Sequence, residues 1–282
     1  MSGVIQRIDC GRPALLEFRG PDAVRFLNGQ LTQDARLLAG GKISLPSCVT
    51  DAKGRMQFRV WLTESPDGAL WVEGPAERAD ELEARLTRYL IADDVEVRAL
   101  TGEWLLVHLT GITADAPPGV VTRENARFGV PGTDWWIPSG VEIRPPDGFP
   151  ELTGEALEAF RIANGVPLWG SELSEGLLPP EAGLDATDIS YQKGCYIGQE
   201  VISRVKSAGK VNKRLARLLI DAGLPAAGLR LVDAAGADAG ALTSVSPLVS
   251  GNGRPALAYL KRGVGEVFVE DAMGRLHPAR MI

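Results

Sequence analysis

The chain has few of the residues that mark secreted or metal-binding proteins. Its 282 residues include three cysteines and two histidines. The cysteines Cys10, Cys48 and Cys195 lie far apart and form no CxxC pair, which argues against a disulfide framework. With two histidines, an all-protein zinc or iron site is not expected, although a lone thiol can still join a shared or transient metal site. We interpret Cys10 and Cys48 as small buried side chains.

Long apolar runs and an excess of positive charge are also missing. No run approaches the roughly 18 apolar residues of a membrane span. The N-terminal segment carries Asp9 and Glu17 and has no apolar region of the kind found in targeting peptides. These features predict a cytoplasmic protein without a membrane partner. The net charge of −6 provides no general electrostatic footprint for nucleic acid. Walker A, GxSxG, HExxH and EF-hand patterns are absent, as is a GxGxxG after a strand.

The first part of the chain alternates between strand and helix patterns. Pro21-Asp22 begins a helical pattern that contains Val24, Leu27 and Leu31. Two β-prone runs flank a turn signal at 51–54 and predict a hairpin. The remaining predicted elements are a strand at 69–74, an amphipathic helix at 77–90, and strands at 95–100 and 103–111. This order favours an α+β module with a mostly antiparallel sheet.

The second half has a different texture. Residues from about 111 to 155 are rich in Pro and Gly, and then a helix of about ten residues ends near Asn164-Gly165. A loop follows at 168–185. After residue 210, five or six short β-prone runs predict a small barrel or sandwich. We therefore predict two regions, 1–207 and 208–282.

The stretch KGCYIGQE, from Lys193 to Glu200, places a thiol, an ammonium, a phenol, an amide and a carboxylate within eight residues. Gly194 and Gly198 allow positive φ or close approach of the backbone to a ligand. If a helix begins near Gly198, exposed N–H groups and Lys193 would lower the pKa of the Cys195 thiol. The alternative is a tight turn with Cys195 packed inward. No histidine is close in sequence, so a Cys–His dyad is unsupported.

Three further groups are candidates for ligand contacts. The basic side chains between 201 and 220 could hold a phosphate, a carboxylate tail or RNA, or they could be a solvated linker; they are Arg204, Lys206, Lys210, Lys213, Arg214 and Arg217. Trp135, Trp136 and Trp169 could stack on a flat ring or pack in a core. Glu172 and Glu181 could accept hydrogen bonds from an amidine edge such as that of a pterin, or remain solvated loop charges.

Taken together, the motifs resemble the YgfZ family of folate-binding proteins, relatives of the glycine-cleavage T-protein (aminomethyltransferase). The resemblance rests on KGCYIGQE and, in the same order along the chain, on GPDAVRFLNGQLTQD, DAKGRM, LPPEAGLDATDISYQ, GKVNKRLARLLI and GALTSVSPLVSGNGRPALAYLKR. It implies a T-protein-like fold, with two intertwined α+β modules around a central cavity over 1–207 and a β-barrel over 208–282.

The resemblance also implies a cofactor, partners and a set of site residues. Tetrahydrofolate or a one-carbon derivative would occupy the cavity. The partners would be iron–sulfur client enzymes, including tRNA-modifying enzymes, or cluster carriers. Cys195 would be a reactive thiol beside the cavity. The implied folate-binding residues are Lys193, Gly194, Tyr196, Gly198, Gln199, Glu200, Glu172, Glu181 and Trp169.

Two departures from the T-protein pattern bear on activity. Gln57 and Phe58 stand where that enzyme has an acidic pair, and the segment matching its acidic pterin-binding stretch offers only Asp134. A general base is therefore missing there. The leading hypothesis is a folate-binding iron–sulfur assembly or repair factor, for which the sequence leaves catalytic turnover open. The alternatives are a folate-dependent aminomethyl or methyl transferase or demethylase, and a non-enzymatic RNA-contacting module.

Overall fold

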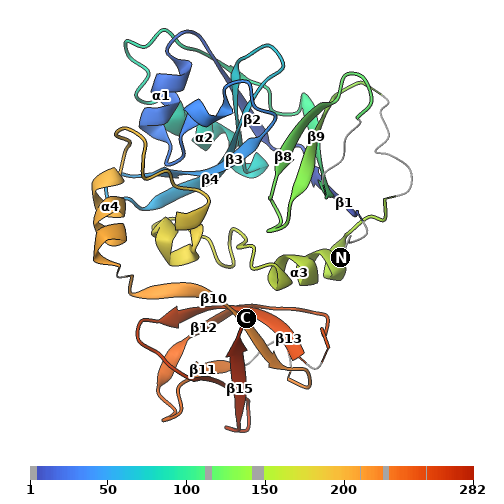
Figure 1. Cartoon of the computed structure of the whole chain (residues 1–282), viewed down its shortest axis with the longest axis vertical. Helices are drawn as coiled ribbons and strands as arrows, with labels where there is room; N and C mark the ends of the chain where they lie inside the picture. Colours follow the sequence, from blue (N-terminus) through green and yellow to red (C-terminus); the bar gives the residue numbers. More distant parts are fainter. Residues whose placement is uncertain (1–4, 112–115, 142–148, 210, 225–228, 252) are drawn as a thin grey trace. The chain divides into compact units, whose positions relative to one another are not determined.

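The computed structural model describes residues 5–111, 116–141, 149–209, 211–224, 229–251 and 253–282 (Figure 1). The chain forms two compact units, each made of two segments. One comprises Met1–Leu152 with Ala186–Ser203, and the other comprises Thr153–Asp185 with Arg204–Ile282. The sequence predicted a single boundary at 207/208, whereas residues 153–185 cluster with the C-terminal region. No helix among the described residues is long and apolar enough to cross a membrane.

The first unit contains a five-stranded antiparallel sheet in the order β3-β4-β5-β2-β6. Its strands are β2 (Ala14–Arg19), β3 (Ser44–Thr50), β4 (Met56–Glu64), β5 (Leu70–Gly74) and β6 (Glu96–Ala99). The helices that accompany it are α1 (Ala23–Gln30), η1 (Ala35–Leu38), η2 (Ala76–Arg78) and α2 (Ala79–Thr87). One face of the sheet shares a core with α1 and α2, in which Leu27 and Leu82 pack with Phe58, Val60 and Leu62 of β4.

The same unit contains a four-stranded sheet in the order β1-β7-β9-β8. Its strands are β1 (Arg7–Gly11), β7 (Trp104–Thr110), β8 (Val121–Asn125) and β9 (Gly132–Pro138). Trp136 packs with Leu15 and Trp71 of the five-stranded sheet, so the two sheets share an apolar core. Trp135 belongs to the core on the opposite face. Both indoles are buried. Of the two roles expected for them, packing in a core is the one observed, rather than stacking on a ligand.

The predicted hairpin, strands and helices of this unit are observed, but two helices are shorter than predicted. The helix expected at 77–90 is α2, Ala79–Thr87, preceded by η2. β3 and β4 form a hairpin whose turn is closed by the bond from Gly54 N to Asp51 O, 2.9 Å. The helical pattern after Pro21 is interrupted, because α1 ends at Gln30 and Leu31 is extended. Leu31 instead forms an isolated bridge with Val49, and this bridge ties the end of α1 to the hairpin.

The second unit combines α3 (Gly154–Ala163) and η3 (Pro179–Ala182) with a closed six-stranded barrel. The barrel strands are β10 (Lys213–Asp221), β11 (Arg230–Val232), β12 (Asp238–Val245), β13 (Gly253–Lys261), β14 (Val267–Glu270) and β15 (Leu276–Met281). The predicted stop of α3 is confirmed, since Asn164 is its C-cap and Gly165 adopts φ +73°. The barrel rather than the sandwich is the observed form. Two elements, η4 (Leu184–Ala186) and α4 (Gln199–Ala208), cross the unit boundaries.

Candidate functional site

The KGCYIGQE segment is tied by its middle residue to two elements of the first unit. Ile197 N donates to Gly29 O of α1 over 3.1 Å. Thr50 Oγ1, at the end of β3, donates to Ile197 O over 2.6 Å. α4 begins at Gln199, directly after Gly198, and this confirms the predicted helix start. The segment is therefore a fixed part of the unit, positioned by bonds to its backbone.

Lys193 anchors the beginning of the segment from inside the protein. Lys193 is 7% exposed, and its ammonium donates to Leu31 O at 2.8 Å and Gln33 O at 2.6 Å. It also lies 5.3 Å from the centre of the Tyr196 ring. Burial lowers the pKa of Lys193 to about 8, because two carbonyls replace only part of the hydration of a cation. These contacts explain its position, while its contact with folate stays a prediction.

The two glycines of the segment have different surroundings. Gly198 has φ +89°, and a Cβ there would lie 2.5 Å from Asp51 O and 2.8 Å from Gly54 Cα. The hairpin turn of the protein itself therefore requires glycine at this position. A Cβ on Gly194 would meet nothing within 4 Å. Gly194 is thus not required for packing among the described residues.

Cys195 is the exposed member of the three cysteines, whereas Cys48 is buried and Cys10 is half-buried. The thiol of Cys195 does not pack inward, so the ligand-facing alternative is the one that its exposure permits. The neighbouring Tyr196 is 7% exposed. Its hydroxyl is buried without a hydrogen-bond partner among the described residues, and burial raises its pKa. Gln199 is half-buried and Glu200 is exposed.

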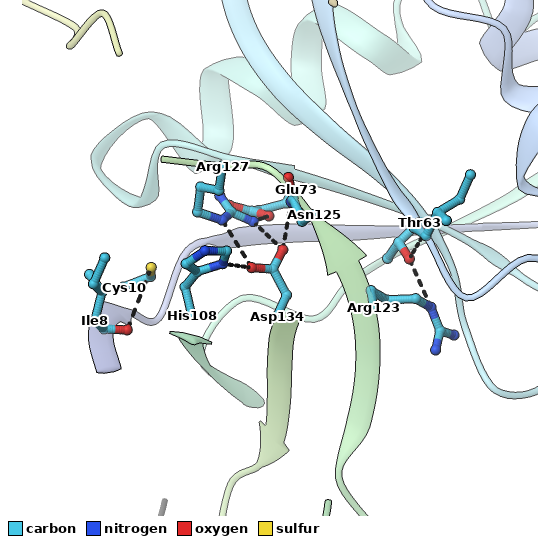
Figure 2. Close-up of polar contacts among 10 residues, drawn as sticks. Ile8, Cys10, Thr63, Glu73, His108, Arg123, Asn125, Arg127 and Asp134 are labelled. Carbon is cyan, nitrogen blue, oxygen red and sulfur yellow. Dashed lines mark hydrogen bonds and ion pairs between the residues drawn. The ribbon is translucent and has the colours of Figure 1, made fainter. Parts of the chain in front are cut away.

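A buried ionic cluster joins the two sheets of the first unit (Figure 2). Arg127 donates to both carboxylate oxygens of Glu73 on β5, at 2.7 and 2.6 Å. It also donates to Asp134 on β9, at 2.9 and 3.3 Å. His108 Nδ1 and Asn125 Nδ2 each lie 2.7 Å from an oxygen of Asp134. His108 and Asp134 are opposite each other in the pairing of β7 with β9, so the register of the two strands places their side chains in contact.

The charges of this cluster set the pKa values of its members. Burial alone would raise the pKa of Asp134, but Arg127 and His108 outweigh it and hold the pKa well below its usual range. Burial dominates at Glu73 and raises its pKa, even beside Arg127. Burial also raises the pKa of the Cys10 thiol to about 12. Cys10 is therefore protonated at neutral pH.

The polar face of β4 consists of Gln57, Arg59 and Trp61, which alternate with the core residues of that strand and are half-buried. Arg59 Nε donates to Asp188 Oδ2 over 2.7 Å, and the Asp188 side chain is fully buried. The guanidinium carbons of Arg59 and Arg127 lie 4.9 and 4.4 Å from the centre of the Trp61 ring. Asp188 leads into the KGCYIGQE segment, so these contacts connect that segment with β4.

Sequence reasoning missed this polar face and the ionic cluster behind it. The alternation of Gln57, Arg59 and Trp61 with apolar residues could have indicated this face. A strand that alternates in this way buries one face in the core and turns the other toward solvent or a ligand. Asp134 was noted only as a single acidic residue in a segment without a clear match. Its partners come from distant parts of the chain.

Three predicted folate-binding residues belong to the second unit. Glu172 is buried and accepts from Arg161 Nη1 at 2.9 Å, Leu168 N at 3.0 Å and Ser244 Oγ at 2.6 Å. Its carboxylate is thus engaged in fixing the 168–173 loop to the barrel. Trp169 and Glu181 are half-buried. The Glu181 carboxylate accepts from Leu178 N at 3.4 Å, across its own turn.

The basic residues of 204–217 have separate surroundings. Lys210 lies outside the described residues. Arg214 pairs with Asp185 at 3.0 Å, and Lys213 Nζ lies 4.4 Å from the centre of the Tyr259 ring. Arg217 donates to the carbonyl of Ala163. These contacts hold several of the cations against their own unit.

The chain has a T-protein-like fold. A solved structure of the glycine cleavage system aminomethyltransferase T from Bartonella henselae matches with a TM-score of 0.81, at 20% identity, over 99% of this chain and 85% of that one. At that identity the match shows the fold. No family model matches the sequence.

Curated relatives define the family more closely. The tRNA-modifying protein YgfZ of Klebsiella pneumoniae (strain 342) is 30% identical over 226 residues, which are 71% of this chain and 67% of that protein. The iron-sulfur cluster assembly factor IBA57 homolog, mitochondrial, of Chaetomium globosum is 29% identical over 238 residues, which are 71% of this chain and 53% of that protein. The chain belongs to the YgfZ family.

Proposed function

We propose that this protein binds tetrahydrofolate or a one-carbon derivative and supports iron–sulfur cluster assembly or repair in client enzymes, including tRNA-modifying enzymes, in the cytoplasm. The observation that carries the proposal is the KGCYIGQE segment. It is held by Lys193, Thr50 and Gly29, and it leaves Cys195 exposed. Two relatives are named a tRNA-modifying protein and an iron–sulfur cluster assembly factor. These names support cluster assembly as the process in which such a thiol would act.

The polar face of β4 and the Tyr196 hydroxyl are the groups that we assign to folate. Gln57, Arg59 and Trp61 combine amide, guanidinium and indole on one half-buried face, as expected of a surface that contacts a polar heteroaromatic ligand. The buried hydroxyl of Tyr196 lacks a partner among the described residues. A ligand that accepts its hydrogen bond would remove the cost of that unsatisfied donor.

Cys195 is the group that we assign to the client reaction. A thiolate is a ligand for iron, so an exposed thiol can contact a cluster or an iron ion that is the cargo rather than a resident cofactor. A single thiol cannot complete the ligand set of a cluster, and the other ligands would come from the client or carrier protein. The Cys195 contact would therefore form only in a complex.

Aminomethyl transfer is the weaker candidate. On the polar face of β4, Gln57 stands near the place where the T-protein has its acidic pair, and Gln57 Oε1 accepts a hydrogen bond from Arg85 Nε at 2.6 Å. None of its three side chains is a carboxylate, and the adjoining carboxylates of Asp188 and Glu73 are held by Arg59 and Arg127, so the face offers no free general base among the described residues. We therefore assign binding and cluster support, without turnover.

Two experiments test the two halves of the proposal. In equilibrium dialysis against tetrahydrofolate under anaerobic conditions, Trp61→Leu should weaken binding, while Tyr89→Leu, at an exposed aromatic after α2, should not. In cells that lack the endogenous protein, Cys195→Ala should lower the activities of cluster enzymes, while Cys48→Ala, at a buried thiol, should retain them. Wild-type behaviour of Trp61→Leu would remove the β4 assignment, and full activity with Cys195→Ala would remove the thiol assignment.

A further inference from the structure

The second unit contains a pocket that the proposed function does not use. Its volume is about 340 Å³, within the range of small-molecule sites. Its walls come from β10, β13, η3, the turn after α3 and the end of β15; the lining residues are Gly165, Ala182, Gly183, Leu215, Ala216, Arg217, Leu257, Met281 and Ile282. Apart from Arg217, these side chains are apolar or absent. The pocket is thus an open depression with apolar side chains, exposed backbone and one cationic side chain.

Arg217 is an exposed side chain at the edge of this pocket. One of its terminal N–H groups donates to the carbonyl of Ala163, at the end of α3. Its stem passes over Gly165, where a Cβ would lie 2.6 Å from Arg217 Cδ. Glycine at 165 therefore makes the room that this side chain occupies. These two contacts direct the guanidinium along the wall of the pocket.

Arg217 forms no ion pair among the described residues. The terminal residue Ile282 also lines the pocket, and its N–H donates to Arg217 O at 3.1 Å, but its carboxylate forms no ion pair with the guanidinium. Most of the N–H groups of a guanidinium remain available when one is engaged. They form a planar fork that fits the two oxygens of a carboxylate or a phosphate.

Both observations define the chemistry of an occupant. Half-buried Leu215 and exposed Met281 are the lining side chains that can offer apolar surface to a ligand, since Leu257 is fully buried. The exposed apolar surface of Met281 would be removed from water by a bound apolar group, which is favourable. We propose that this pocket binds a small organic anion, with its carboxylate or phosphate on Arg217 and its apolar part against Leu215 and Met281.

Calorimetric titration of the full chain with octanoate, octyl phosphate and octanol tests this site, at probe concentrations below those at which micelles form. We expect the wild type to bind at least one of the two anions more tightly than octanol, and the tighter of the two identifies the headgroup.

Arg217→Gln should weaken anion binding roughly tenfold, the value of a charge-assisted hydrogen bond, and should leave the affinity for octanol unchanged. Arg262→Gln, at an exposed barrel arginine outside the pocket, is the control and should bind as the wild type does.

A second variant separates the site from an effect on folding. Met281→Ala, at an exposed position, should weaken the anions and octanol alike while the thermal midpoint stays unchanged. The proposal is overturned if neither anion binds the wild type more tightly than octanol. It is equally overturned if Arg217→Gln, with an unchanged circular dichroism spectrum, binds the anions as tightly as the control does.

Discussion

Asp134→Asn tests the buried ionic cluster with a change of charge at nearly constant volume. The Asp134 side chain is 0% exposed and that of Arg127 is 8% exposed. Both carboxylate oxygens accept hydrogen bonds, from His108, Asn125 and Arg127. In the variant, one oxygen becomes an NH₂ group that faces donors. Removing one partner of a buried ion pair costs about 3–5 kcal/mol.

The lower end of that range applies here, because Arg127 keeps both of its bonds to Glu73. We expect the free energy of unfolding to fall by about 3 kcal/mol. With a slope of about 3 kcal/mol per molar urea, the midpoint shifts down by roughly 1 M. Tryptophan fluorescence follows the relevant unit, since of the six tryptophans only Trp169 lies in the second one.

Asp67→Asn is the matched control in the same unit. Asp67 pairs with Arg19 at 2.6 Å, but the two side chains are 62% and 44% exposed. A pair at the surface contributes at most about 1 kcal/mol. If Asp134→Asn cost no more than this control, the cluster would not hold the two sheets together, and the reasoning would fail.

The same variant carries a signature in pH. The folded pKa of Asp134 lies below its ordinary value of 3.8. The contribution of its charge is therefore present above that value and is lost as the pH falls toward the folded pKa. The stability difference between the wild type and Asp134→Asn should narrow below about pH 4. A difference that stayed constant from pH 7 to pH 3 would mean that the lost contacts are not ionic.

Three further predictions concern the KGCYIGQE segment. Gly198→Ala should lower the free energy of unfolding by at least about 2 kcal/mol, and the thermal midpoint with it, because φ at Gly198 is positive and Asp51 O is close. Gly194→Ala should stay within about 0.5 kcal/mol of the wild type. Equal losses in the two variants would refute the requirement for glycine at the turn. Lys193 has a folded pKa of about 8 against an ordinary value of 10.5, so its folded form loses the proton first. Stability should then rise with pH between those values in the wild type, and urea unfolding of Lys193→Met should lack that rise. A thiol reagent should modify Cys195 rapidly in the native protein, and Cys48 only after unfolding. Peptide mapping that found Cys48 modified as fast as Cys195 in the native state would contradict the burial of Cys48.

The secondary structure could be predicted because its signals are local. The turn at 51–54, the leucines of α2 and the glycine after α3 each lie within a few residues of what they determine. The barrel followed in the same way, from short β-prone runs separated by turn residues. The end of α1 could not be predicted, because Leu31 leaves the helical pattern to pair with Val49. That contact lies outside any local window.

The candidate site was predicted in part for the same reason. The motif could be found by spacing and residue type, whereas the exposure of Cys195 was left open between a ligand-facing and an inward-packed thiol. The roles of Lys193 and Gly198 in packing could not, because their partners are carbonyls and backbone of distant segments. Arg59 and Asp188 are 129 residues apart, and no periodicity connects them. Buried ion pairs of this kind are set by tertiary packing, and the sequence shows only that charged residues are present.

The central claim is that the protein binds folate and keeps Cys195 free for a separate reaction. Anaerobic calorimetric titration of tetrahydrofolate into the wild type and Cys195→Ala tests it most directly. We predict roughly micromolar binding to both proteins, because Cys195 is exposed and holds no part of the segment in place. Loss of binding in Cys195→Ala alone would make the thiol part of the folate site. Absence of binding to the wild type would contradict the account.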